Sequence, residues 1–71
     1  MSRYAVIYEQ TPSGGWSAYV PDLPGCVAAS KSRDGLRRLM RGAIAFHIEG
    51  LRLHGEPVPA PTSSAGTVSV K

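Results

Sequence analysis

The most informative stretch of this chain is Val20-Pro21-Asp22-Leu23-Pro24-Gly25-Cys26-Val27, which joins two short apolar runs. Its two prolines lack a backbone N–H and fix φ, so neither a helix nor a central strand can run through it. The Pro24-Gly25 pair favours a tight turn with Gly25 at positive φ. The stretch therefore predicts a rigid corner between strands. Two interpretations stay open: a purely structural corner, or one whose exposed edge also contacts a partner through Pro21, Asp22, Leu23, Pro24 and Gly25.

Strand-forming sequences lie on both sides of this corner. Residues 3–10 are rich in β-branched and aromatic side chains and predict a first strand. Residues 11–15 have the composition of a hairpin turn and lead into a second strand over residues 16–20. Residues 26–29 predict a short third strand after the corner. Alternation places Tyr4, Val6 and Tyr8 on one face of the first strand. In the same way it places Trp16, Ala18 and Val20 on one face of the second strand.

The second half of the chain predicts one long helix, from Ser32 to His54. Ser32 is a suitable N-cap, and Gly55 is a natural stop. Such a helix is much longer than the strands, so we expect one end to overhang the sheet. Apolar residues recur at intervals of three and four and predict a buried stripe of Leu36, Leu39, Met40, Ala43, Ile44, His47, Ile48 and Leu51. Phe46 is also expected in the core.

We expect a single domain over residues 1–71, of class α+β, with a small antiparallel β-β-β-α-β sheet and the helix packed on one face. Residues 57–66 form a Pro/Ser-rich loop, and residues 67–70 alternate as a last strand would. That strand could pair within the chain or across an interface. A chain of 71 residues with one cysteine has no internal disulfide. Because so small a core supplies only ~3–5 kcal/mol, we expect self-association as a homodimer or homotetramer.

The composition also limits location and partners. The start of the chain has no apolar segment typical of a signal peptide, and no apolar run approaches the ~20 residues of a membrane span. A lone cysteine without an export signal suits the reducing cytoplasm. The net charge of +3 permits a nucleic-acid or acidic partner but requires neither.

A basic face is the main charged feature of the predicted helix. It carries Arg37, Arg38, Arg41 and Arg52. One interpretation is a solvated surface, and the alternative is a nucleic-acid or acidic-protein contact. No aromatic residue is interleaved with the three arginines at positions 37–41, which counts against stacking on single-stranded RNA.

No constellation of residues predicts an enzyme. Cys26 and His47 could form a nucleophile–base pair only if the helix crosses the third strand there. No Asn or further His could orient the base, and Asp22 is the only nearby candidate for that role. His54 lies two turns from His47, too far to share a metal ion with it. We therefore expect no catalytic residue, no metal and no cofactor. A small-molecule site in a cleft between copies of the chain, near Trp16, Tyr19 and Cys26, has only pocket-forming aromatics in its favour.

The sequence resembles the HicB-type antitoxin family. The resemblance rests on residues 4–9, on Gly15-Trp16-Ser17-Ala18-Tyr19-Val20-Pro21-Asp22-Leu23-Pro24-Gly25-Cys26, on the cap at Ser32, and on residues 43–51 and 55–61. It implies a β-β-β-α-β domain that forms dimers or higher oligomers. It also implies neutralisation of a HicA-type toxin, a small mRNA-cleaving ribonuclease, by covering the toxin surface.

Two departures from the family pattern change what is carried over. The sequence ends at Lys71 without the C-terminal DNA-binding segment of full-length members, so promoter binding is not expected. Gly35 and a run of arginines partly replace the acidic residues usual at the helix start. A basic toxin would be repelled by that face, so we expect a toxin at the corner and the strand edges, with Asp22 as the charged contact. An orphan family member without a toxin is the other interpretation.

Overall fold

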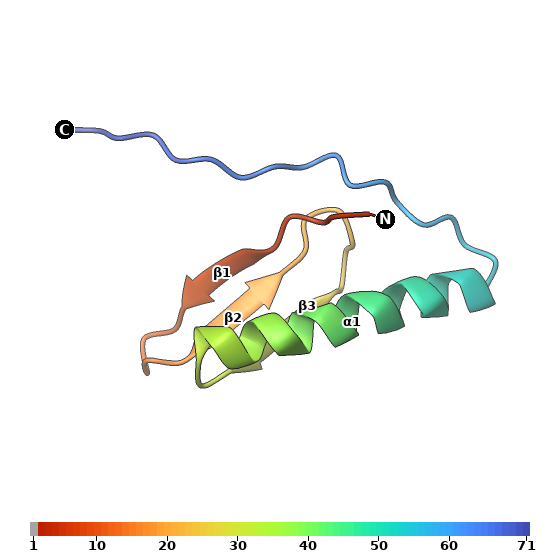
Figure 1. Ribbon diagram of the computed structural model, residues 1–71, viewed down its shortest axis with the longest axis horizontal. Coiled ribbons are helices and arrows are strands. Elements are labelled where there is room, and N and C mark those ends of the chain that lie inside the picture. The colour runs from red at the N-terminus through yellow and green to blue at the C-terminus, as the bar shows by residue number, and fades with distance from the viewer. Residues whose placement is uncertain (1) are drawn as a thin grey trace.

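The computed structural model describes residues 2–71 and consists of a three-stranded antiparallel sheet followed by one long helix. The strands are β1 (Ile7–Gln10), β2 (Trp16–Tyr19) and β3 (Val27–Ser30), and the helix is α1 (Arg33–Leu53). The strands are in the order β1-β2-β3, and α1 lies across one face, over β2 and β3 (Figure 1). This arrangement confirms the predicted α+β class.

The register of the sheet follows from its two connections. Gln10 pairs with Trp16 around the 11–15 turn, and Tyr19 pairs with both Ile7 and Val27. The predicted first strand is too long, because only Ile7–Gln10 is paired. Residues 3–6 extend beyond the end of β2, where the chain turns into the corner and offers no strand to pair with.

Helix α1 has clear signals at both ends. The Ser32 hydroxyl accepts a hydrogen bond of 3.0 Å from the Gly35 backbone N–H, which confirms the predicted N-cap. At the other end Gly55 has φ +69. Its N–H donates to the Arg52 carbonyl, and the Glu56 N–H donates to the Leu51 carbonyl. This pair of bonds is a Schellman motif, which satisfies carbonyls left free by the last turn.

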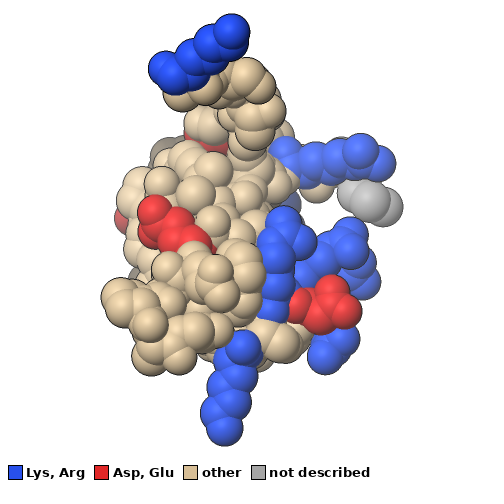
Figure 2. All heavy atoms as spheres, turned by 90° about the vertical axis from the view of Figure 1, so that its left-hand side faces the viewer, with Lys and Arg blue, Asp and Glu red and all other residues tan. Residues whose placement is uncertain are grey.

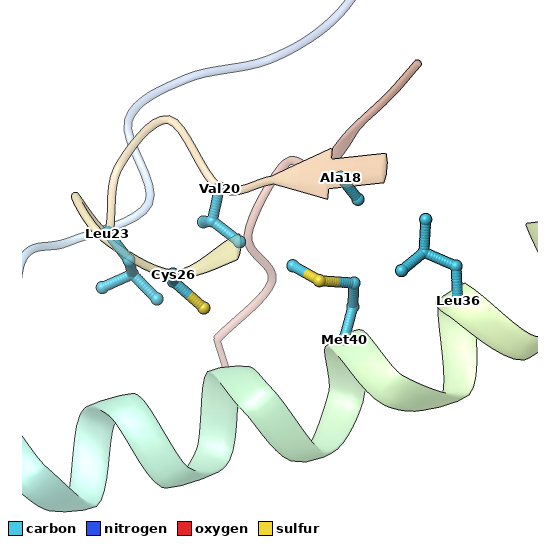
Figure 3. Close-up of a cluster of buried hydrophobic side chains, with 6 residues drawn as sticks. All are labelled: Ala18, Val20, Leu23, Cys26, Leu36 and Met40. Atoms are coloured by element: carbon cyan, nitrogen blue, oxygen red, sulfur yellow. The ribbon is translucent and has the colours of Figure 1, made fainter. Parts of the chain in front are cut away.

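The core is small and lies between the N-terminal half of α1 and one face of the sheet. The helix contributes only two fully buried side chains, Leu36 and Met40. Figure 3 shows that they point toward side chains from β2 and the corner. The buried hydrophobic residues are Ala18, Val20, Leu23, Cys26, Leu36 and Met40.

Two core predictions for the helix were wrong. Leu39 is 51% exposed and Phe46 is 80% exposed. A helix of 21 residues is ~31 Å long, whereas strands of four residues span only ~13 Å. The C-terminal half of α1 therefore overhangs the sheet, as expected (Figure 1). Leu39 and Phe46 are exposed because they lie ~100–120° around the helix from Met40, away from the face that packs on the core.

The chain after the helix has no regular secondary structure. Residues 56–71 run back along the molecule as an extended tail (Figure 1). The predicted last strand at 67–70 is absent from the single chain, where Val68 and Val70 are 87% and 88% exposed. Alternation alone does not make a strand when no edge lies within hydrogen-bonding reach. Pairing of this segment between chains stays a prediction.

Candidate partner-binding site

The corner consists of two consecutive tight turns that share Leu23. The Leu23 N–H donates to the Val20 carbonyl at 3.1 Å, and the Cys26 N–H donates to the Leu23 carbonyl at 3.0 Å. Gly25 has φ +87, as its place in the second turn predicts. A further bond of 3.2 Å from the Val20 N–H to the Cys26 carbonyl closes the base of the corner.

The corner separates its residues into an inner and an outer set. Leu23 has no exposed surface and packs in the core, whereas Pro21, Pro24 and Gly25 are exposed. A partner can therefore contact the two prolines and Gly25 but not the Leu23 side chain. Because Leu23 anchors the turns from inside, the exposed residues lie on a rigid support.

The fifth corner residue, Asp22, contacts the tail of its own chain. One carboxylate oxygen, Oδ2, accepts the backbone N–H groups of Thr62 and Ser63 at 3.0 and 2.9 Å. The other, Oδ1, accepts their hydroxyl groups at 3.1 and 2.9 Å. We call these four hydrogen bonds the Asp22 latch. Sequence reasoning missed it, because a contact across forty residues leaves no local pattern.

The latch changes the acidity of Asp22. The hydrogen bond from the Ser63 backbone N–H, assisted by the two hydroxyls and the Thr62 N–H, lowers the pKa of this carboxyl below its ordinary value. Partial desolvation acts in the opposite direction and is outweighed. Asp22 is thus held as a carboxylate whose acceptor positions are occupied by the tail. A toxin that used this charge would have to displace Thr62 and Ser63.

Cys26 and His47 both lie near the corner. The His47 ring passes 3.9 Å from the point where a Cβ on Gly25 would stand, so α1 does cross the chain here. Cys26 itself is only 4% exposed, and burial raises the pKa of its thiol. A thiol held in its neutral form is a poor nucleophile. Within one chain Cys26 is buried and Tyr19 is 41% exposed, so a small-molecule cleft between copies near these residues stays a prediction.

The arginines of α1 form the wall of a groove beside β1. The groove has a volume of about 1080 Å³, and its apolar floor includes Met40 and Ile44. Arg37, Arg38 and Arg41 line it, together with Arg3, Tyr4 and Tyr8 from the first segment of the chain. Figure 2 shows Lys and Arg side chains gathered along one side of the molecule. Arg52 lines an adjoining hollow, also with Tyr4.

The fold thus brings Tyr4 and Tyr8 to Arg37, Arg38 and Arg41, although no aromatic residue lies between these arginines in the helix sequence. The signal was present in the alternation of Tyr4, Val6 and Tyr8, but the sequence does not say which helix face meets that strand. The tyrosines are not free stacking platforms. The Arg33 guanidinium lies 4.4 Å above the centre of the Tyr8 ring, and the Tyr4 hydroxyl donates to the Pro59 carbonyl at 2.6 Å.

Two kinds of feature are absent from residues 2–71. No group of three or more His, Cys, Asp or Glu side chains is placed to bind a metal ion. Over the same residues, no helix combines the length and the apolar character that crossing a bilayer requires.

Comparison with known proteins assigns the family. A profile described as the HicB-like antitoxin of bacterial toxin–antitoxin systems matches residues 4–70. The chain belongs to the HicB-like antitoxin family. This match confirms the resemblance, and it includes the corner, α1 and most of the tail. The HicB-like antitoxin family is not normally catalytic, in keeping with a buried, neutral Cys26.

Curated relatives of this HicB-like chain are of similar length. A UPF0150 protein of Thermoplasma acidophilum is 32% identical over 66 residues, covering 93% of this chain and 96% of the relative. A UPF0150 protein of Archaeoglobus fulgidus is 34% identical over 47 residues, covering 66% of this chain and 68% of the relative. The small β-β-β-α unit is therefore similar to proteins of about the same size.

Proposed function

We propose that this HicB-like chain is an antitoxin that neutralises a HicA-type, mRNA-cleaving toxin by covering its surface. The observation that carries the proposal is the family match over residues 4–70. The proposed contact is the exposed part of the corner, Pro21, Pro24 and Gly25, with Asp22 joining when the tail is displaced. The rigid support from Leu23 favours this surface, because a contact that is already ordered loses little conformational entropy on binding. In this role the chain has no catalytic residue and acts in the cytoplasm, where mRNA is the toxin's substrate.

Self-association is part of this proposal. The folded chain exposes 5690 Å², whereas a compact monomer of 7.5 kDa is expected to expose roughly 4,200 Å². The extended tail accounts for part of the excess. The exposed apolar side chains Leu39, Phe46 and Leu53 of α1 support a homodimer or homotetramer in which this surface is covered.

Co-expression tests the antitoxin function. A HicA-like reading frame adjacent to this gene is expressed alone and together with this chain, and growth and pull-down are measured. We expect rescued growth and a stable complex. Absence of both would contradict the antitoxin function and favour an orphan family member.

A charge variant tests the corner itself. Pro21→Arg adds a positive charge at an exposed corner position and should weaken rescue, because HicA-type toxins tend to be basic. Pro57→Arg is the matched control, since it adds the same charge at an exposed proline outside the corner. Equal rescue by both variants would show that the toxin binds elsewhere.

Nucleic-acid binding through Arg37, Arg38, Arg41 and Arg52 is a second candidate function. The observation in its favour is the groove beside β1. It is lined by Arg37, Arg38 and Arg41 together with Arg3, and no acidic residue lines it. Because Tyr8 is already covered by Arg33, the contacts would be mainly to phosphates. Affinity for labelled single-stranded RNA should fall steeply with salt and should fall further in Arg37→Glu/Arg41→Glu. Lys31→Glu, outside the groove, is the control, and no binding at low salt would exclude this function.

A further inference from the structure

Helix α1 has a second apolar face that nothing in the described chain covers. Leu39, Phe46 and Leu53 are 51%, 80% and 79% exposed. They are spaced by seven residues, so successive side chains are rotated by only ~20° about the helix axis. The three therefore form one line along the helix. This line lies beside the face that carries Leu36 and Met40. A face with three large exposed apolar side chains in one row is typical of an interaction surface.

Two glycines lie on the same face and have no role within the chain. A Cβ added to Gly42 or to Gly50 would meet no atom within 4 Å, and neither residue has positive φ. Each costs about 1 kcal/mol of helix stability relative to alanine. Nothing inside one chain therefore requires them, whereas a second helix packed on this face would. We call Leu39, Gly42, Phe46, Gly50 and Leu53 the Phe46 stripe.

The Phe46 stripe is symmetric about its centre. Gly42 and Gly50 lie four residues on either side of Phe46, and Leu39 and Leu53 lie seven residues on either side. An interface with two-fold symmetry uses the same patch on both subunits, so the patch must complement itself in reverse. Two antiparallel copies centred on Phe46 would place Leu39 of each against Leu53 of the other, and Gly42 against Gly50.

We infer that the Phe46 stripe is the surface through which a second copy of this chain docks, as an antiparallel helix pair. In that arrangement each Phe46 ring leans toward the N-terminus of its own helix, because helical side chains point that way. The ring then lies over the Gly42–Gly50 pair formed with the partner. The glycines provide the space that two aromatic rings at one two-fold axis need.

Charge and area both favour a second copy as the occupant. The stripe carries no charged side chain, whereas the groove beside β1 carries four arginines, which would face one another across a two-fold axis there. The chain exposes 5690 Å², roughly 1,500 Å² above the expectation for a compact 7.5 kDa monomer, and the extended tail supplies part of this excess. Stable interfaces bury about 1,200–2,000 Å² in total, about half from each partner, and three large exposed apolar side chains in one row are a natural centre for such an interface.

Cysteine cross-linking tests the stripe and its direction. This inference rests on the proposed self-association, so the oligomeric state of the unmodified chain is measured first by analytical ultracentrifugation. Phe46→Cys should then form a disulfide-linked dimer under mild oxidation. Leu39→Cys alone should not, because its two copies would lie ~21 Å apart along the axis. Leu39→Cys mixed with Leu53→Cys should link. The unmodified chain, whose Cys26 is buried, is the control.

The outcomes test self-association and the antiparallel pairing of the Phe46 stripe separately. A dimer in which Phe46→Cys does not link, or in which Leu39→Cys links to itself, would overturn the antiparallel stripe and leave self-association intact. A monomer at tens of micromolar would overturn both.

A charge variant provides a second measurement. Phe46→Glu should raise the dimer dissociation constant at least tenfold while leaving the circular dichroism spectrum unchanged, since the side chain is 80% exposed. Val27→Glu is the matched control, because Val27 is an exposed apolar residue, at 65%, on the face of the sheet that points away from α1. Dissociation by Val27→Glu rather than by Phe46→Glu would assign the interface to the sheet and overturn the stripe.

Discussion

The Asp22 carboxylate accepts both the backbone N–H and the hydroxyl of Ser63, forty-one residues later in the chain. This relationship ties the corner to the tail, although the two segments share no strand pairing. It also means that the corner's only charged residue is available to a partner only when the tail moves. The tail and any partner that uses Asp22 are therefore expected to compete.

Removal of the carboxylate should release the tail. In Asp22→Ala all four latch hydrogen bonds are lost, so the Thr62 and Ser63 amides should exchange with solvent at the rate of an open chain. Amide hydrogen exchange by NMR measures this effect. Asp34→Ala removes an exposed acid from the first turn of α1 and should leave the exchange of both tail amides unchanged. Equal exchange in Asp22→Ala and the parent chain would show that the latch does not hold the tail.

The latch should also respond to pH in a defined direction. The hydrogen bonds from the tail lower the folded-state pKa of Asp22 below the ordinary 3.8. A depressed carboxyl pKa contributes stability that is present above the ordinary value and is lost as pH falls through the lowered one. The Thr62 and Ser63 amide resonances should therefore titrate with a midpoint below 3.8, and this titration should be absent from Asp22→Ala. A midpoint above 3.8 would contradict the stated direction.

Leu23 should be essential for the folded corner. It is fully buried, and truncation of a buried leucine costs about 2–5 kcal/mol of unfolding free energy. Because the core of so small a chain supplies only ~3–5 kcal/mol, Leu23→Ala should be largely unfolded. Urea denaturation followed by circular dichroism measures the loss. Val68→Ala, in the exposed tail, should change the unfolding free energy by less than about 0.5 kcal/mol.

Gly25 should tolerate no side chain without strain. At φ +87 an alanine would occupy the left-handed region, which costs about 1–2 kcal/mol. Gly25→Ala should lower the denaturation midpoint accordingly, although the nearest neighbouring atom, on His47, is 3.9 Å from the new Cβ and causes no clash. Gly66→Ala is the control, because Gly66 has open space and no positive φ. An unchanged midpoint in Gly25→Ala would show that the second turn adapts.

Local features of this chain were predictable because their causes are local. Proline geometry and the glycine at positive φ fix the corner, and Ser32 and Gly55 fix the two ends of α1 within one residue. The alternation placed Trp16, Ala18 and Val20 on one face, and Ala18 and Val20 are both buried. The family, too, is assigned by residues that the sequence presents directly.

Other features depend on how the elements meet in space. The apolar spacing placed Leu39 in the core, yet Leu39 lies ~100° around α1 from Met40, and the sheet packs only against the face that carries Met40. Tyr8 reaches the arginines, and Thr62 reaches Asp22, through contacts between distant segments that no local pattern encodes. By itself the sequence determined the turns, the caps and which side chains share a face of a strand, because these follow from φ, missing donors and side-chain period. Only the tertiary structure decided which apolar face of α1 the sheet covers and which it leaves for a partner, because a helix with two apolar faces is covered only as far as the sheet extends.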